Sequence, residues 1–148
     1  MSAVGEIRDG LKSRVETLLG VAYKPKPFMY LVEDNGNLGL KTYALRIGEA
    51  QTSPGTNQHL TWSQSFEVEL SHRYENKKGS GDSDLQDKIS SLMTDLETVY
   101  KGLSLTRFPI TAGTILNIAP LDISSPDIDN NVVTIVLSLN VLYRTPIN

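Results

Sequence analysis

The sequence predicts an α+β fold in which two helices cover one face of a mainly antiparallel sheet, and a long β-hairpin protrudes from it. Three observations indicate this fold. Two segments repeat apolar residues at helical spacing, several others alternate apolar and polar residues, and the segments follow the order α-β-β-β-α-β-β. A chain of 148 residues is expected to form a single domain over residues 1–148.

The amino-acid composition excludes several classes of protein. With 39% hydrophobic and 21% charged residues, the chain is typical of globular proteins. A formal net charge of −3 argues against a dedicated nucleic-acid binder. The absence of cysteine excludes disulfides, thiol nucleophiles and thiolate metal sites. No apolar run reaches the roughly 20 residues of a membrane span, and the start does not resemble a signal peptide. We therefore expect no membrane partner and assembly in the cytoplasm.

The first expected helix runs from Ser2, a suitable N-cap, to Gly20, a suitable C-terminal stop. A second helix is expected over Asp84–Lys101, with a capping box at Ser83 and Gly102 as its stop. Each has one apolar face, formed by Val4, Ile7, Leu11, Val15, Leu18 and Leu19 in the first and by Leu85, Ile89, Leu92, Met93, Leu96, Val99, Tyr100 and Leu103 in the second.

Alternating and apolar segments predict the strands. Prolines extend the chain over Lys24–Pro27, and the Asn35-Gly36 pair is a strong turn signal. Polar loops are expected at Gln51–His59 and Glu75–Asp84, and a turn-rich connection at Pro120–Asn131. The expected strands are Phe28–Val32, the two arms of a hairpin over Tyr43–Tyr74, Ile110–Ala119, and Val133–Tyr143.

The segment Leu60–Tyr74 is the most informative. Its apolar and polar residues alternate over fifteen positions, which indicates a strand about 50 Å long. A globule of this chain length is only about 35–40 Å across, so the hairpin should project with part of its apolar face uncovered. Exposed apolar surface of this kind marks an interaction site, and Leu60, Trp62 and Phe66 are the predicted oligomer contacts. The alternative is a bulge that bends the strand back onto its own sheet.

The sequence predicts no catalytic, cofactor or metal site, and we expect the protein not to be an enzyme. His59 and His72 lie too far apart along one strand to share an ion, so packed or interfacial histidines are favoured. The lysines of Lys77–Gly81 precede the glycines, unlike a phosphate-binding loop. Asp127–Asn131 lacks the glycine and glutamate of a calcium loop and is interpreted as a turn.

The acidic pair Glu67 and Glu69 alternates with serine and arginine on a polar strand face. Such a face is typical of a hydrated sheet surface rather than of a cleft for acid–base hydrolysis. The sequence also contains no Gly-x-Ser-x-Gly nucleophile elbow.

The order of elements resembles that of the tailed-phage tail terminator, or tail completion, proteins. The resemblance covers nearly the whole chain: the N-terminal helix Val4–Leu19, the hairpin Tyr43–Tyr74, the helix Asp84–Lys101 and the final strand through Leu139–Arg144. It rests on architecture and not on a diagnostic motif.

The resemblance implies a structural virion protein of the tail or neck that forms a ring, which in that family is a hexamer. The ring would cap the tail tube, end its polymerisation and offer a surface to the head–tail connector protein, while DNA passes through the lumen without specific binding. An acidic subunit suits such a channel because a basic one would retain phosphates. The loops Gln51–His59 and Glu75–Asp84 become candidate contacts to tube or connector.

Two alternatives stay open at this point. The chain could be another ring component of the same machine, a head–tail joining or tail tube subunit. It could also be a small α+β ligand-binding domain or enzyme, which predicts a monomer or dimer with a pocket of ionisable groups.

Overall fold

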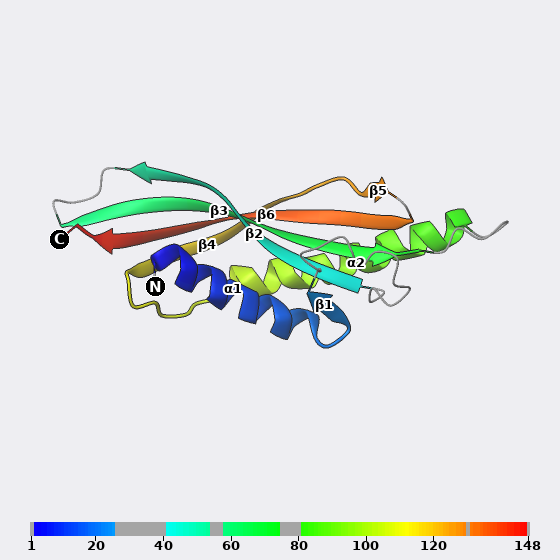
Figure 1. Cartoon of the computed structure of the whole chain (residues 1–148), viewed down its shortest axis with the longest axis horizontal. Helices are drawn as coiled ribbons and strands as arrows, with labels where there is room; N and C mark the ends of the chain where they lie inside the picture. Colours follow the sequence, from blue (N-terminus) through cyan, green and yellow to red (C-terminus); the bar gives the residue numbers. More distant parts are fainter. Residues whose placement is uncertain (1, 26–40, 54–57, 75–80, 130, 148) are drawn as a thin grey trace.

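The computed structural model describes residues 2–25, 41–53, 58–74, 81–129 and 131–147. The predicted α+β architecture is confirmed: two helices lie together on one side of a mainly antiparallel sheet (Figure 1). The elements in chain order are α1 (Ala3–Leu19), β1 (Tyr23–Pro25), β2 (Lys41–Ser53), β3 (His59–Arg73), α2 (Gly81–Ser104), β4 (Thr114–Ile123), β5 (Asp127–Asp129) and β6 (Val132–Pro146).

The sheet has the order β1-β2-β3-β6-β4, and β5 pairs with β6 beside β4. Only the β1–β2 pair is parallel. β3 and β6 pair along their whole length, from His59 opposite Pro146 to Arg73 opposite Val132. The last strand of the chain is therefore the centre of the sheet, held by β3 on one side and by β4 and β5 on the other.

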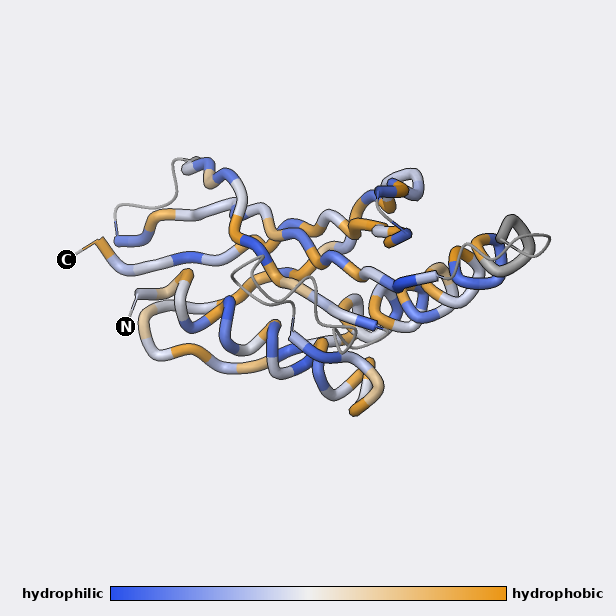
Figure 2. Tube along the Cα trace, turned by 45° about the vertical axis from the view of Figure 1, so that its right-hand side comes forward, coloured by the Kyte–Doolittle hydropathy of each residue, from blue (hydrophilic) through white to orange (hydrophobic). Residues whose placement is uncertain are grey.

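The core lies between the sheet and the helices, as the alternation in the sequence predicts. Along β6 every second residue from Val133 to Tyr143 is buried, and the residues between them are only partly covered. Hydrophobic and hydrophilic positions alternate along the strands in Figure 2. The helices close the core with fully buried side chains, which are Ile7, Leu11 and Val15 from α1 and Leu92, Leu96, Val99 and Leu103 from α2.

The ends of α1 form as predicted. The Ser2 hydroxyl accepts a hydrogen bond from the Gly5 backbone N–H at 3.2 Å, which satisfies one of the free donors of the first turn. Gly20 has φ +77°, and its N–H donates to the Glu16 carbonyl at 2.9 Å. This left-handed conformation is the reason for a glycine at the stop.

The ends of α2 differ from the prediction. The helix begins at Gly81, so Ser83 lies inside the helix instead of capping it. It also continues through Gly102 to Ser104. Gly102 is needed for packing rather than as a stop, because a Cβ atom there would lie 2.5 Å from the Leu18 side chain of α1.

Three strand predictions also change. Residues 23–25, expected in or next to an extended connection, form the parallel strand β1, whereas the predicted strand Phe28–Val32 lies outside the described residues. β4 starts at Thr114 instead of Ile110, because residues 105–111 run along α1. The predicted connection Pro120–Asn131 contains the end of β4 and all of β5. Asp127–Asp129 were interpreted as part of a turn but form β5, and a turn lies at Asn131, which has φ +63°.

Candidate functional site

The predicted hairpin is formed by β2 and β3, but it does not project alone. β6 follows β3 to the outer end of the hairpin, where His59 and Pro146 are paired. In Figure 1 the outer part of β2 rises away from the helices at this end. The outer end of the sheet therefore contains β2, β3, β6 and the start of β4, and the side chains of β3 have neighbours from β6.

Trp62 packs against one of these neighbours. Its ring stacks on Tyr143, with 6.3 Å between the centroids and 12° between the planes. Its indole N–H donates to the Thr145 hydroxyl at 2.9 Å. The side chain is only partly buried, so the indole stabilises the outer end of the sheet and keeps some accessible surface.

The other two predicted contacts differ from each other. Leu60 is partly buried near the end of β3 and keeps accessible surface. Phe66 is fully buried and belongs to the chain's own core. A side chain with no exposed area cannot contact a neighbouring subunit. Phe66, predicted as a ring contact, is therefore a core residue.

A bulge in β2 bends the hairpin at its middle. The β2–β3 register shifts between Ile47 and Ala50. The Gln64 side chain, 3% exposed, donates to the carbonyl oxygens of Gly48 and Glu49 at 2.8 and 3.2 Å. The alternation in the sequence placed Gln64 on the apolar face but gave no reason for a polar residue there. In the structure its amide donates hydrogen bonds to the carbonyls that the bulge leaves without a strand partner.

The sheet has two open edges within the described part of the chain. β1 covers β2 only from Lys41 to Tyr43, so the rest of β2 has no strand on its outer side. β4 pairs with β6 alone. Unpaired N–H and C=O groups along an edge strand favour pairing with another chain.

The edge strands carry hydrophobic side chains that remain exposed. Ile47 on β2 is 48% exposed, and Leu116 and Leu121 on β4 are 42% and 53% exposed. Single exposed apolar residues are common on protein surfaces, but here they lie on the two strands that have an open edge in the described part of the chain.

The sheet face opposite the helices is polar. Its side chains bond across the strands: Ser63 donates to Asn140 at 2.9 Å, and the Ser71 and Thr134 hydroxyls lie 3.0 Å apart. Arg46 and Glu69 form an ion pair at 3.1 Å. The glutamates therefore lie on a polar sheet face, as interpreted, but this face is not hydrated throughout, because Glu69 is only 7% and Ser71 only 4% exposed.

Two tyrosines attach the first strands to the helices. Tyr23 donates to Asp95 of α2 at 2.6 Å, and Tyr43 donates to Glu16 of α1. Burial, reinforced by the carboxylate that each hydroxyl meets, raises the pKa of both tyrosines far above the usual value. The first bond joins β1 to α2, and the second joins β2 to α1.

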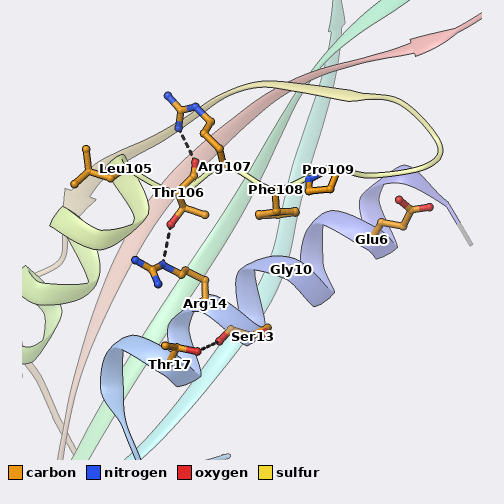
Figure 3. A pocket seen from close by; sticks show the side chains of 10 residues that line it. All are labelled: Glu6, Gly10, Ser13, Arg14, Thr17, Leu105, Thr106, Arg107, Phe108 and Pro109. Carbon is orange, nitrogen blue, oxygen red and sulfur yellow. Dashed lines mark hydrogen bonds between the residues drawn. The ribbon is translucent and has the colours of Figure 1, made fainter.

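A polar groove lies between α1 and the segment that follows α2 (Figure 3). Its volume is about 580 Å³, and Phe108 forms part of its wall directly over Gly10, where any Cβ atom would clash with the ring. At one end Glu6 accepts hydrogen bonds from the Thr111 N–H and hydroxyl, which lower the pKa of the Glu6 carboxyl. Nothing local in the sequence predicts this groove.

The described residues hold no group of three or more histidine, cysteine or acidic side chains placed to bind a metal ion. His72 is 5% exposed, as expected of a packed histidine. Neither described helix is long and apolar enough to span a bilayer.

The predicted loop contacts can be placed in part. Gln51–Ser53 belongs to β2 and His59 to β3, while residues 54–57 lie outside the described part of the chain. Residues 75–80 also lie outside it, and residues 81–84 form the first turn of α2 instead of a loop. No known protein-family model and no curated protein sequence matches this chain.

Proposed function

We propose that the protein is a structural subunit of a tailed-phage virion that forms a ring at the end of the tail tube, ends the polymerisation of the tube and offers a surface for head–tail joining. The observation that carries the proposal is that the sheet, as far as the described residues form it, has two open edges, on β2 and on β4. The resemblance in the order of elements supplies the place of the ring in the virion.

The two edges differ in sequence and lie on opposite flanks of the sheet. A contact between β2 of one copy and β4 of the next is therefore heterologous, and it closes into a ring when the rotation per copy divides a full turn. Such closure removes both exposed edges at once. Six copies is the number that the resemblance implies.

The two faces of the sheet suggest how a subunit is oriented in the ring. Helices cover one face, whereas the other carries small polar side chains such as Ser63 and Asn140. A ring with the helices outside leaves this polar face toward the lumen and leaves the channel open. A polar face with paired charges, such as Arg46 with Glu69, suits a channel through which DNA moves without being bound.

The first experiment measures the mass and shape of the purified protein. Mass photometry and negative-stain electron microscopy should find discrete closed rings, and added tail tube protein of the same virus should yield capped tubes of limited length. Long tubes from this protein alone would indicate a tube subunit instead. A 16.3 kDa monomer at high concentration, with tube protein present, would contradict the proposal and favour a small binding domain.

A matched pair of variants tests the role of the edge. Leu116→Lys places a charge on the open strand β4, and lysine on an edge strand opposes pairing. Met93→Lys makes the same change at a residue of similar exposure on α2, 39% against 42%. We expect the Leu116 variant to lose the ring and the Met93 variant to keep it. Equal behaviour of the two variants would contradict an edge-to-edge ring.

A further inference from the structure

The groove between α1 and residues 105–109 contains two arginines that have no acidic partner among the described residues. Arg14 uses its Nε atom to donate to the Thr106 hydroxyl at 3.2 Å, and Arg107 donates to the Thr106 carbonyl at 2.6 Å. Both arginine side chains are therefore held by Thr106, and each keeps guanidinium N–H groups that can donate to a ligand (Figure 3). Arginine in this state binds carboxylates through two parallel hydrogen bonds.

Apolar side chains border these arginines. Leu105 lines the same groove and is 82% exposed, and Phe108 forms the wall over Gly10. We call this surface the arginine groove, defined by Arg14, Leu105, Thr106, Arg107 and Phe108. A partner that fits it must combine carboxylates with apolar side chains.

The same chain carries a surface of that chemistry, formed where β4 ends and β5 follows. Its carboxylates are Asp122, Asp127 and Asp129, all exposed and without an ion pair to any described residue. Leu121 and Ile128, which are 53% and 47% exposed, lie among them in sequence. We call these five residues the acidic corner.

One chain cannot bring its own groove and corner together. The segment before β4 runs along α1, but β4 leads away from it, from Thr114 opposite Arg144 to Ile123 opposite Leu137, and β5 pairs with the start of β6. In Figure 1, β5 lies on the side of the sheet away from the helices, at the end where β6 begins. The two surfaces therefore remain available to different copies.

We infer that the acidic corner of one copy binds the arginine groove of the next copy. The aspartates pair with Arg14 and Arg107, while Ile128 and Leu121 cover Leu105 and Phe108. Desolvated arginine beside apolar anchors is the usual composition of the centre of an interface. This inference rests on the proposed ring and names a contact that sets the register between subunits, since complementary charges fix orientation.

Charge reversal on each surface provides the test. The groove variant is Arg14→Glu with Arg107→Glu, and the corner variant is Asp127→Lys with Asp129→Lys. Lys12→Glu with Lys101→Glu is the control for the groove variant, because it changes the net charge equally, on α1 and in the last turn of α2, outside the groove. Circular dichroism establishes that each variant is folded, and sedimentation velocity measures its mass.

We expect the groove and corner variants each to need at least about tenfold more protein for half-assembly, while the control assembles like the wild type. An equimolar mixture of the two variants should recover the ring, because each reversed surface then meets an oppositely charged one. A defect in folding could not be rescued by mixing. Added salt should weaken the wild-type ring.

The outcomes separate this inference from the proposed function. If the wild type never assembles, both fail. If the wild type forms rings but the reversed variants assemble like the control, the ring stands and the contact is wrong. If the variants dissociate but mixing restores nothing, the two surfaces do not bind each other and the inference is again overturned.

Discussion

Replacing Trp62 distinguishes a stabilising role within one chain from a role between chains. Trp62→Ala removes the stack on Tyr143 and the hydrogen bond to Thr145. The stack contributes about 1 kcal/mol and the hydrogen bond about 1 kcal/mol. The partly buried remainder of the ring contributes about another 1 kcal/mol, well below the 3–5 kcal/mol for a fully buried aromatic residue.

We therefore expect Trp62→Ala to lower the free energy of unfolding by about 3 kcal/mol, which is a fall of roughly 6–12 °C in Tm for a chain of this size. Urea unfolding at a concentration low enough to keep the chain monomeric removes the contribution of assembly. Trp62→Phe is the matched control, since it keeps a ring to stack on Tyr143, and it should lose only about 1–2 kcal/mol.

An unfolding free energy within about 0.5 kcal/mol of the wild type in Trp62→Ala would refute this reasoning. If such a variant also failed to assemble, the indole would act mainly between subunits, as the sequence alone suggested. Stability lost in the dilute monomer would instead assign it to the outer end of the sheet.

Three further predictions follow from buried or hydrogen-bonded groups. Phe66→Ala should lower the free energy of unfolding by about 3–5 kcal/mol, because the ring is fully buried, whereas Phe66→Leu should cost less than about 1.5 kcal/mol; urea unfolding measures both. Thr111→Val should raise the pKa of Glu6 toward its ordinary value, as measured by NMR titration, because the hydroxyl that bonds the carboxylate is removed. In the wild type, the stability that the Glu6–Thr111 hydrogen bonds provide should be lost as the pH falls through the lowered pKa of Glu6. The folded state keeps the Tyr43 hydroxyl protonated above about pH 10, the ordinary pKa of tyrosine. The stability that depends on this protonated hydroxyl should be complete below about pH 10 and decline as the pH rises further. Tyr43→Phe should show a smaller decline when Tm is measured against pH.

The sequence predicted correctly those features that depend on residues close together in the chain. Ser2 and Gly20 determine the ends of α1 through a side-chain cap and a left-handed backbone. The alternation along β3 correctly placed Phe66 on the buried face. Gly102 was wrongly interpreted as a helix stop. A glycine is needed there because the Leu18 side chain, on another helix, packs where a Cβ atom would lie, and only the folded chain brings the two residues close.

The candidate surfaces were predictable only in part, for a related reason. The length of the hairpin indicated where the sheet outreaches the helices, but not that β6 would run beside Trp62 and cover it. Arg14 and Arg107 come from distant parts of the sequence, and no periodicity connects them. Their proximity follows from the path of residues 105–111 along α1, and of these only Ile110 and Thr111 had been assigned to a strand.

The central position of β6 has a consequence for synthesis on the ribosome. β3 and β4 are made before the strand that joins them, and one side of β3 has no strand to pair with until Val132–Pro146 has emerged. Contacts this distant along the chain make folding slow. The nascent chain therefore presents unsatisfied strands late into translation, so a truncated product without β6 would aggregate instead of forming a smaller version of the subunit.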